Sequence, residues 1–107
     1  MKSLPVLFTA LAEEDLDQIE DYICASDPAA AARVRATIVR QSLELAKRPA
    51  KGMALREPAN EQEIGVRLWP VSRYRNYLIL YRIEAELIRV LRILPAAQDW
   101  TRFFGND

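Results

Sequence analysis

Apolar residues in the first part of the chain recur at the spacing of a helix. Ala12, Leu16, Ile19 and Ile23 follow one another at steps of four, three and four residues, which places them on one helix face. Thr9 stands in front of them as an N-cap, and the acids that follow it meet the positive end of the helix dipole. We therefore expect an amphipathic helix here.

A second helix is predicted directly after the first. Asp27 is a suitable N-cap, and Pro28 occupies the first helical position, where its missing N–H would have had no partner anyway. The helix ends before Pro49, and its apolar stripe consists of Val34, Ile38, Val39, Leu43, Leu45 and Ala46. Because the break between the two helices is short, they should form an antiparallel hairpin.

After Gly65 the pattern becomes that of strands, in segments 66–71, 74–83 and 87–94, which are rich in branched and aromatic residues. Short connections at 72–73 and 84–86 indicate an antiparallel meander. Period-two alternation assigns Tyr77, Ile79 and Tyr81 to one face and Leu78 and Leu80 to the other. In the last segment it places Ile88, Val90 and Leu94 on one side, and Leu87, Leu91 and Ile93 on the other.

The remaining segments complete the expected fold. Residues 4–8 form a short apolar run with Pro5, which is best tolerated at a sheet edge, so we expect an edge strand. Residues 51–63 contain Gly52, Pro58 and Asn60 without periodicity, so we expect a loop. The order β-α-α-β-β-β predicts an α+β fold of two helices on one small sheet, forming a single domain over residues 1–107.

Composition excludes several kinds of chemistry. The chain has one cysteine and no histidine, so we expect no disulfide within it, no bound metal and no cofactor. No stretch resembles a signal peptide or a membrane-spanning helix, which indicates a cytoplasmic protein without a membrane partner. Fifteen basic residues balance fifteen acidic ones, so no overall field attracts the chain to nucleic acid.

The charges are nevertheless unevenly distributed along the chain. The first 30 residues hold seven acids and one base, and the rest holds fourteen bases and eight acids. The molecule should therefore carry an acidic and a basic face. These faces are either ordinary solvated surfaces or, for the basic one, a partner-binding site.

Several segments, in this order, resemble the ParE/RelE toxin superfamily over nearly the whole chain. They are Ala12–Ile23 with its acidic helix, the Asp27-Pro28-Ala29-Ala30-Ala31 helix entry, Gly65-Val66-Arg67, Val71-Ser72-Arg73-Tyr74-Arg75, Leu80-Tyr81-Arg82 and Ile88–Leu94. The resemblance implies the toxin of a type II toxin–antitoxin system. In this superfamily, RelE-like members cleave messenger RNA on the ribosome, and ParE-like members poison DNA gyrase.

The segment after the last strand favours the ParE-like branch. Where related toxins often show an arginine, this chain has Gln98. A neutral amide cannot supply the charge that RNA cleavage requires on the phosphoryl oxygens, and loss of one well-placed donor typically lowers the rate by about 10²–10³. Two alternatives stay open. One is a RelE-like ribonuclease using Arg67, Arg73, Tyr74 and Tyr81, and the other is a non-toxic relative that only binds an antitoxin.

The resemblance also implies two protein-binding surfaces. A ParD-like antitoxin, forming a hetero-oligomer with the toxin, is expected in a groove beside the helix hairpin and along a sheet edge, contacted by Arg67, Arg73, Arg75, Tyr74 and Tyr81. Gyrase is expected at the C-terminal tail, through Trp100, Arg102, Phe103 and Phe104, with Trp69 near them. We expect no specific nucleic-acid binding by the toxin alone.

Each of these residues also has an ordinary structural role. Arginines on strands can pair with acids of the first helix or keep strand edges soluble. The tyrosines can pack their rings while their hydroxyls stay in water, and the tail aromatics can cover the open face of the sheet.

Overall fold

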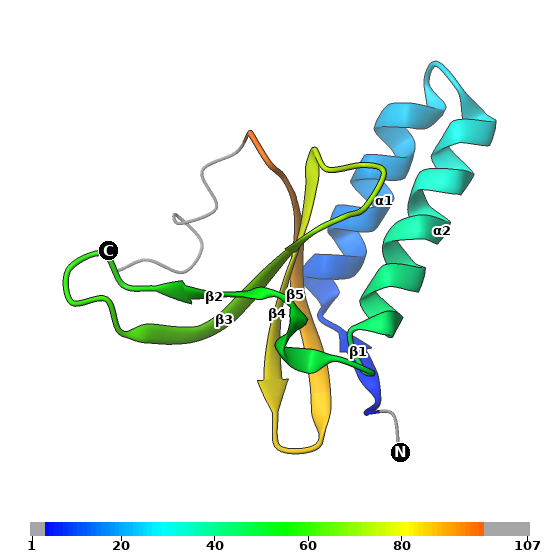
Figure 1. Cartoon of the computed structure of the whole chain (residues 1–107). Coiled ribbons are helices and arrows are strands. Elements are labelled where there is room, and N and C mark those ends of the chain that lie inside the picture. The colour runs from blue at the N-terminus through cyan, green and yellow to red at the C-terminus, as the bar shows by residue number, and fades with distance from the viewer. Residues whose placement is uncertain (1–3, 98–107) are drawn as a thin grey trace.

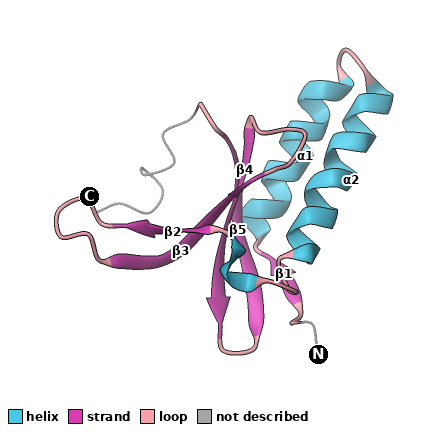
Figure 2. Ribbon diagram, viewed as in Figure 1, coloured by secondary structure: helices cyan, strands magenta, loops and turns pink. Residues whose placement is uncertain are grey.

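The computed structural model describes residues 4–97 and shows two helices on one face of a five-stranded sheet (Figures 1 and 2). The elements are β1 (Val6–Phe8), α1 (Ala10–Cys24), α2 (Pro28–Glu44), the 3₁₀ turn η1 (Pro49–Lys51), β2 (Met53–Arg56), β3 (Glu63–Pro70), β4 (Tyr77–Glu84) and β5 (Leu87–Pro95). The strand order in the sheet is β1-β5-β4-β3-β2. The predicted α+β class, helix hairpin and β3-β4-β5 meander are confirmed.

Both helices begin where the capping residues predict. Thr9 Oγ1 accepts a hydrogen bond of 3.0 Å from the amide of Ala12, and Asp27 Oδ1 accepts one of 3.1 Å from the amide of Ala30. The Thr9 hydroxyl also donates to the carbonyl of Leu91 at 2.8 Å. The start of α1 is thereby fixed to β5.

The N-terminal strand lies at a sheet edge, as predicted. β1 runs parallel to β5, with Val6 opposite Ile88 and Phe8 opposite Val90. Pro5 lies just before the strand, and its carbonyl accepts a hydrogen bond of 2.9 Å from Ile88. Its missing N–H is therefore harmless at this position.

The prediction of a loop over residues 51–63 was wrong in part, because this segment contains β2. Met53 pairs with Leu68 and Ala54 with Arg67, both in antiparallel register with β3. Leu55 is buried among leucines on the sheet face away from the helices. This strand is only four residues long, too short for alternation to reveal it in the sequence.

The predicted side-chain alternation of the last strand holds through Leu91 and was wrong for Ile93 and Leu94. Tyr81 pairs with Val90 but Leu80 pairs with Arg92, which leaves Leu91 as the extra residue of a β-bulge. A bulge reverses the alternation, so that Ile93 packs on the helix side and Leu94 on the opposite side.

The core has two parts, one on each face of the sheet. Leu16 and Ile38 from the helices pack against Ile79, Tyr81 and Val90. On the other face lie Leu55, Val66, Leu68, Leu78, Leu80 and Leu94. The predicted division of β4 between Ile79 and Tyr81 on one face and Leu78 and Leu80 on the other is confirmed. Neither of the described helices combines the length and apolar character needed to cross a membrane.

Candidate functional site

An open groove of about 490 Å³ lies between α1 and the C-terminal end of β5. Its helix side is formed by Gln18, Ile19 and Tyr22, and its sheet side by Tyr77 and the last residues of β5. Ile19 is nearly buried, whereas Tyr22 exposes 81% of its surface. Because so little of the Tyr22 ring is buried within its own chain, the ring is available to a partner. We call this feature the α1–β5 groove.

A buried ion pair borders the groove. Asp15 of α1 accepts hydrogen bonds from Arg92 Nε at 2.8 Å, from Arg92 Nη2 at 2.9 Å and from the amide of Ile93 at 2.9 Å. The two side chains expose only 8% and 18% of their surface. The hydrogen bond to Asp15 raises the pKa of Arg92 above its ordinary value. This pair joins α1 to β5 where the bulge changes the face of the strand.

Pairing with an acid of the first helix was one structural role expected for the strand arginines, and Arg92 has this role. The role of Asp15 escaped the sequence analysis, which counted it among the acids of α1. A signal was present, because Asp15 follows Ala12 by three residues and precedes Ile19 by four, and therefore shares the apolar face. An acid on that face requires a buried partner.

Two tyrosines stand at the groove. Burial raises the pKa of Tyr77, and the nearby Tyr22 raises it further. Both side chains line the groove, Tyr22 from α1 and Tyr77 from β4. Each tyrosine offers an apolar ring and a polar hydroxyl, which can contact the side chains and the backbone of a bound peptide.

Tyr81, predicted to contact the antitoxin, is fully buried. Its hydroxyl donates to the carbonyl of Pro49 at 2.7 Å and accepts from the amide of Gly52 at 2.8 Å. A Cβ on Gly52 would lie 2.6 Å from this hydroxyl, so only glycine fits there. Burial raises the pKa of Tyr81. Its side chain offers no surface to a partner, and its hydroxyl does not stay in water as the structural alternative assumed.

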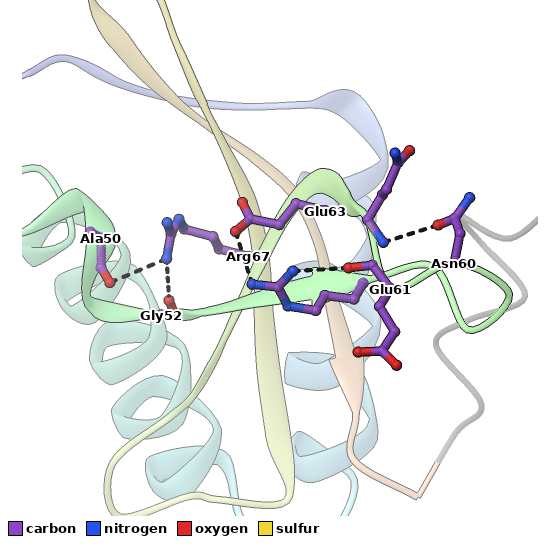
Figure 3. Close-up of polar contacts among 8 residues, drawn as sticks. Ala50, Gly52, Asn60, Glu61, Glu63 and Arg67 are labelled. Carbon is purple, nitrogen blue, oxygen red and sulfur yellow. Dashed lines mark hydrogen bonds and ion pairs between the residues drawn. The ribbon is translucent and has the colours of Figure 1, made fainter.

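Arg67, on β3, also hydrogen-bonds to the segment of residues 49–52. Its Nη1 donates to the carbonyl of Gly52 at 2.7 Å and to that of Ala50 at 3.3 Å, as Figure 3 shows. Figure 3 also shows the neighbouring β2–β3 loop, where an arginine, Arg56, bonds to the carbonyl of Glu61 and the carboxylate of Glu63. Arg67 and Tyr81 together hold residues 49–52 on the sheet.

The other three predicted antitoxin contacts lie together in the connection between β3 and β4. This connection spans residues 71–76 and is longer than the expected turn at 72–73. Arg73 and Arg75 are exposed, and Tyr74 is half-buried against the helix-side core. Asn76 and Tyr77, which follow directly, line the α1–β5 groove. The two arginines therefore precede the groove residues Asn76 and Tyr77 in the chain, and they lie in a different segment from Arg67 and Tyr81.

The predicted gyrase contacts Trp100, Arg102, Phe103 and Phe104 lie outside the described residues, as does Gln98. Trp69, expected near them, is half-buried, and the ammonium of Lys51 lies 4.3 Å from the centre of its ring. Within residues 4–97, no group of three or more acidic, histidine or cysteine side chains could hold a metal ion.

Comparison with known proteins identifies the family of this chain. The family model for the ParE toxin of the type II toxin–antitoxin system, parDE, matches residues 6–100. The chain belongs to this family. A solved structure titled as the chromosomal ParDE system from P. aeruginosa is similar, with 26% sequence identity, a TM-score of 0.70 and coverage of 87% of this chain and 96% of that one. The search of curated proteins gives no match.

Proposed function

We propose that the chain is a toxin that inhibits DNA gyrase by binding it, in the cytoplasm, and that a cognate ParD-like antitoxin neutralises it by occupying its surface. The observation that carries the antitoxin proposal is the α1–β5 groove, whose walls are built from Ile19, Tyr22 and Tyr77. A segment that is disordered when free would gain most by placing apolar anchors in such a groove.

The edges of the sheet supply the second part of the antitoxin surface. β1 and β2 are the edge strands, so each has one side that no described strand pairs. An extended antitoxin segment can add to such an edge through backbone hydrogen bonds. Arg73 and Arg75, in the connection that leads into the groove, would hold its acidic side chains, and Tyr74 would contribute from its half-buried position.

Gyrase is proposed to bind the C-terminal tail through Trp100, Arg102, Phe103 and Phe104. Three large aromatic residues and an arginine within five positions have the composition of a binding hot spot. Membership of the ParE toxin family supports this target over the ribosome.

A RelE-like ribonuclease is the competing function, and two of the four residues named for it are engaged within the chain. RNA cleavage needs a proton acceptor and free cations around the phosphate. Tyr81 is buried and hydrogen-bonded at both lone pair and proton, and Arg67 is occupied by two carbonyls. A non-toxic relative that only binds an antitoxin would instead leave growth unaffected.

Induction of the chain alone in cells tests these alternatives together. We expect growth arrest with altered DNA supercoiling and double-strand breaks, and rescue when the small open reading frame beside it is co-expressed. Transcripts cut within codons on ribosomes, with intact DNA, would establish the ribonuclease. Normal growth would establish the non-toxic relative.

A further inference from the structure

The loop at residues 71–76 is held in a single conformation by its own backbone. The amide of Val71 donates to the carbonyl of Tyr77 at 3.0 Å, that of Tyr74 to Val71 at 3.1 Å, and that of Tyr77 to Tyr74 at 2.9 Å. The amide of Ala96 donates to Asn76 at 2.7 Å, which joins the loop to the end of β5. So many short-range bonds leave the loop little freedom.

Gln41, a buried side chain of α2, attaches the loop to the helix layer. Gln41 is only 7% exposed. Its Nε2 donates to the carbonyl of Ser72 at 3.0 Å, and its Oε1 accepts from the amide of Ser72 at 2.8 Å. A primary amide carries both the donor and the acceptor that these two bonds require. Ser72 is therefore attached to the helix layer immediately before the first exposed arginine.

Arg73 has a backbone conformation that arginine rarely adopts. Its φ is 82°, in the left-handed region where glycine or asparagine is usual. Such a residue persists where the surrounding structure imposes it, and such residues cluster at functional sites. The conformation does not explain why arginine occupies the position, since glycine would fit it without strain.

The two loop arginines also differ from their neighbours in their contacts. Of the seven arginines in residues 53–95, five bond to carbonyls or carboxylates of the chain: Arg56, Arg67, Arg82, Arg89 and Arg92. Arg73 and Arg75 have neither an ion pair nor a side-chain hydrogen bond to any residue that the structure describes. Two exposed guanidinium groups, two positions apart on a fixed loop, are thus free to bind an anion.

We infer that residues 72–75 form a preformed carboxylate-recognition loop, in which Arg73 and Arg75 bind neighbouring acidic side chains of the antitoxin segment seated in the α1–β5 groove, and Gln41 is the positioning residue. This inference rests on the proposed function. The groove next to the loop is lined in part by Ile19, Tyr22 and Tyr77, which suits a peptide that brings apolar anchors together with its carboxylates, whereas a nucleic-acid backbone brings a charge at every phosphate. Fixing the arginines in advance reduces the ordering that binding requires.

Affinity of the full chain for the protein encoded by the adjacent open reading frame provides the test. We expect Arg73→Ala and Arg75→Ala each to weaken binding by about tenfold or more, as loss of a charged hydrogen bond implies. We expect Arg73→Gly to weaken binding equally while its melting temperature stays the same or rises, because glycine accepts the positive φ. The matched control is Glu61→Gly. Glu61 is the other described non-glycine residue with a positive φ, so this variant removes backbone strain at a different loop and should leave affinity unchanged.

The role of Gln41 is tested by a double-mutant cycle. Gln41→Leu should weaken binding in the wild-type loop but add little to Arg73→Ala/Arg75→Ala, whereas its effect on stability should be the same in both backgrounds. Equal losses of affinity in both backgrounds would show that Gln41 acts through stability alone and would overturn its positioning role.

The possible results distinguish failure of the proposed function from failure of the proposed role of residues 72–75. No binding by the wild-type chain would overturn the proposed function and the inference with it. Binding that Arg73→Ala and Arg75→Ala leave within about twofold of wild type would overturn the inference alone. Loss of binding to a short DNA duplex in these variants, with unchanged antitoxin affinity, would show that the loop binds phosphate and would also overturn it.

Discussion

Asp15 of α1 and Arg92 of β5 form a two-point ion pair, with Nε–Oδ2 and Nη2–Oδ1 distances of 2.8 and 2.9 Å. Both side chains are largely buried, and the carboxylate also accepts from the amide of Ile93. The pair connects the helix layer to the sheet beside the α1–β5 groove. It therefore contributes to the stability of the fold and forms part of the groove lining.

Removal of one partner should destabilise the chain strongly. We expect Asp15→Ala to lower the free energy of unfolding by about 3–5 kcal/mol, because it removes the buried carboxylate that accepts from both Arg92 and the amide of Ile93. Urea denaturation measures this. The control is Asp17→Ala, which breaks the bond of an exposed aspartate to Arg35 and should lose less than about 1 kcal/mol. Similar losses for the two variants would contradict this account of the pair.

Tyr81 should make stability fall at alkaline pH. Its pKa is raised in the folded state, so the unfolded chain releases the proton first as pH rises above the ordinary value of 10.0. Its contribution is fully present below that value and is lost as pH rises toward the folded pKa. Tyr77 shifts in the same direction for a related reason, so Tyr77→Phe is the comparison. We expect unfolding free energies measured from pH 8 to pH 11 to decline less steeply in Tyr81→Phe.

The same variant has a second measurable effect near neutral pH. Tyr81→Phe leaves the amide of Gly52 and the carbonyl of Pro49 without their partner. We expect a loss of about 1–3 kcal/mol. An unchanged stability together with an unchanged pH profile would show that the hydroxyl does not hold residues 49–52 in place.

Tyr22 should matter for binding and little for folding. Because its ring is mostly exposed at the groove, Tyr22→Ala should change stability by less than about 0.5 kcal/mol. Antitoxin affinity, measured by calorimetry, should fall by at least about 1 kcal/mol. Leu11→Ala removes another exposed apolar side chain of α1 that does not line the groove, and it should leave affinity unchanged. If both variants bind like wild type, the antitoxin does not use this groove.

Deletion of the tail after Asp99 tests the proposed gyrase surface. We expect inhibition of supercoiling to disappear while the melting temperature and antitoxin binding are retained, since the removed aromatics serve the target. A double variant, Trp100→Ala/Phe104→Ala, makes the same test with a smaller change. Unchanged inhibition would remove the tail from the target site. Loss of folding in both would assign the aromatics to covering the sheet.

The sequence predicts those features that depend on local patterns. The starts of both helices follow from the capping of Thr9 and Asp27, and the two faces of β4 follow from regular alternation between Leu78 and Tyr81. The bulge at Leu91 could not be foreseen, because an apolar residue fits either face of a strand. β2 was missed because four residues without clear alternation resemble a loop.

The candidate site was harder to predict than the fold. Sequence reasoning grouped the strand arginines and tyrosines as one surface, yet their environments differ. Arg67 and Tyr81 are bound to backbone groups of residues 49–52, whereas Arg73 and Arg75 extend from a fixed loop. These differences depend on contacts between residues far apart in the chain, such as the bonds from Gln41 to Ser72. Such contacts cannot be predicted from residue types and spacing alone.

Adding the purified chain to purified DNA gyrase and following the supercoiling of a relaxed plasmid tests whether the chain inhibits gyrase. We expect inhibition that increases with the amount of chain and disappears when the antitoxin is added first. Full supercoiling at every concentration, together with cleavage of messenger RNA on translating ribosomes by the same preparation, would contradict this expectation.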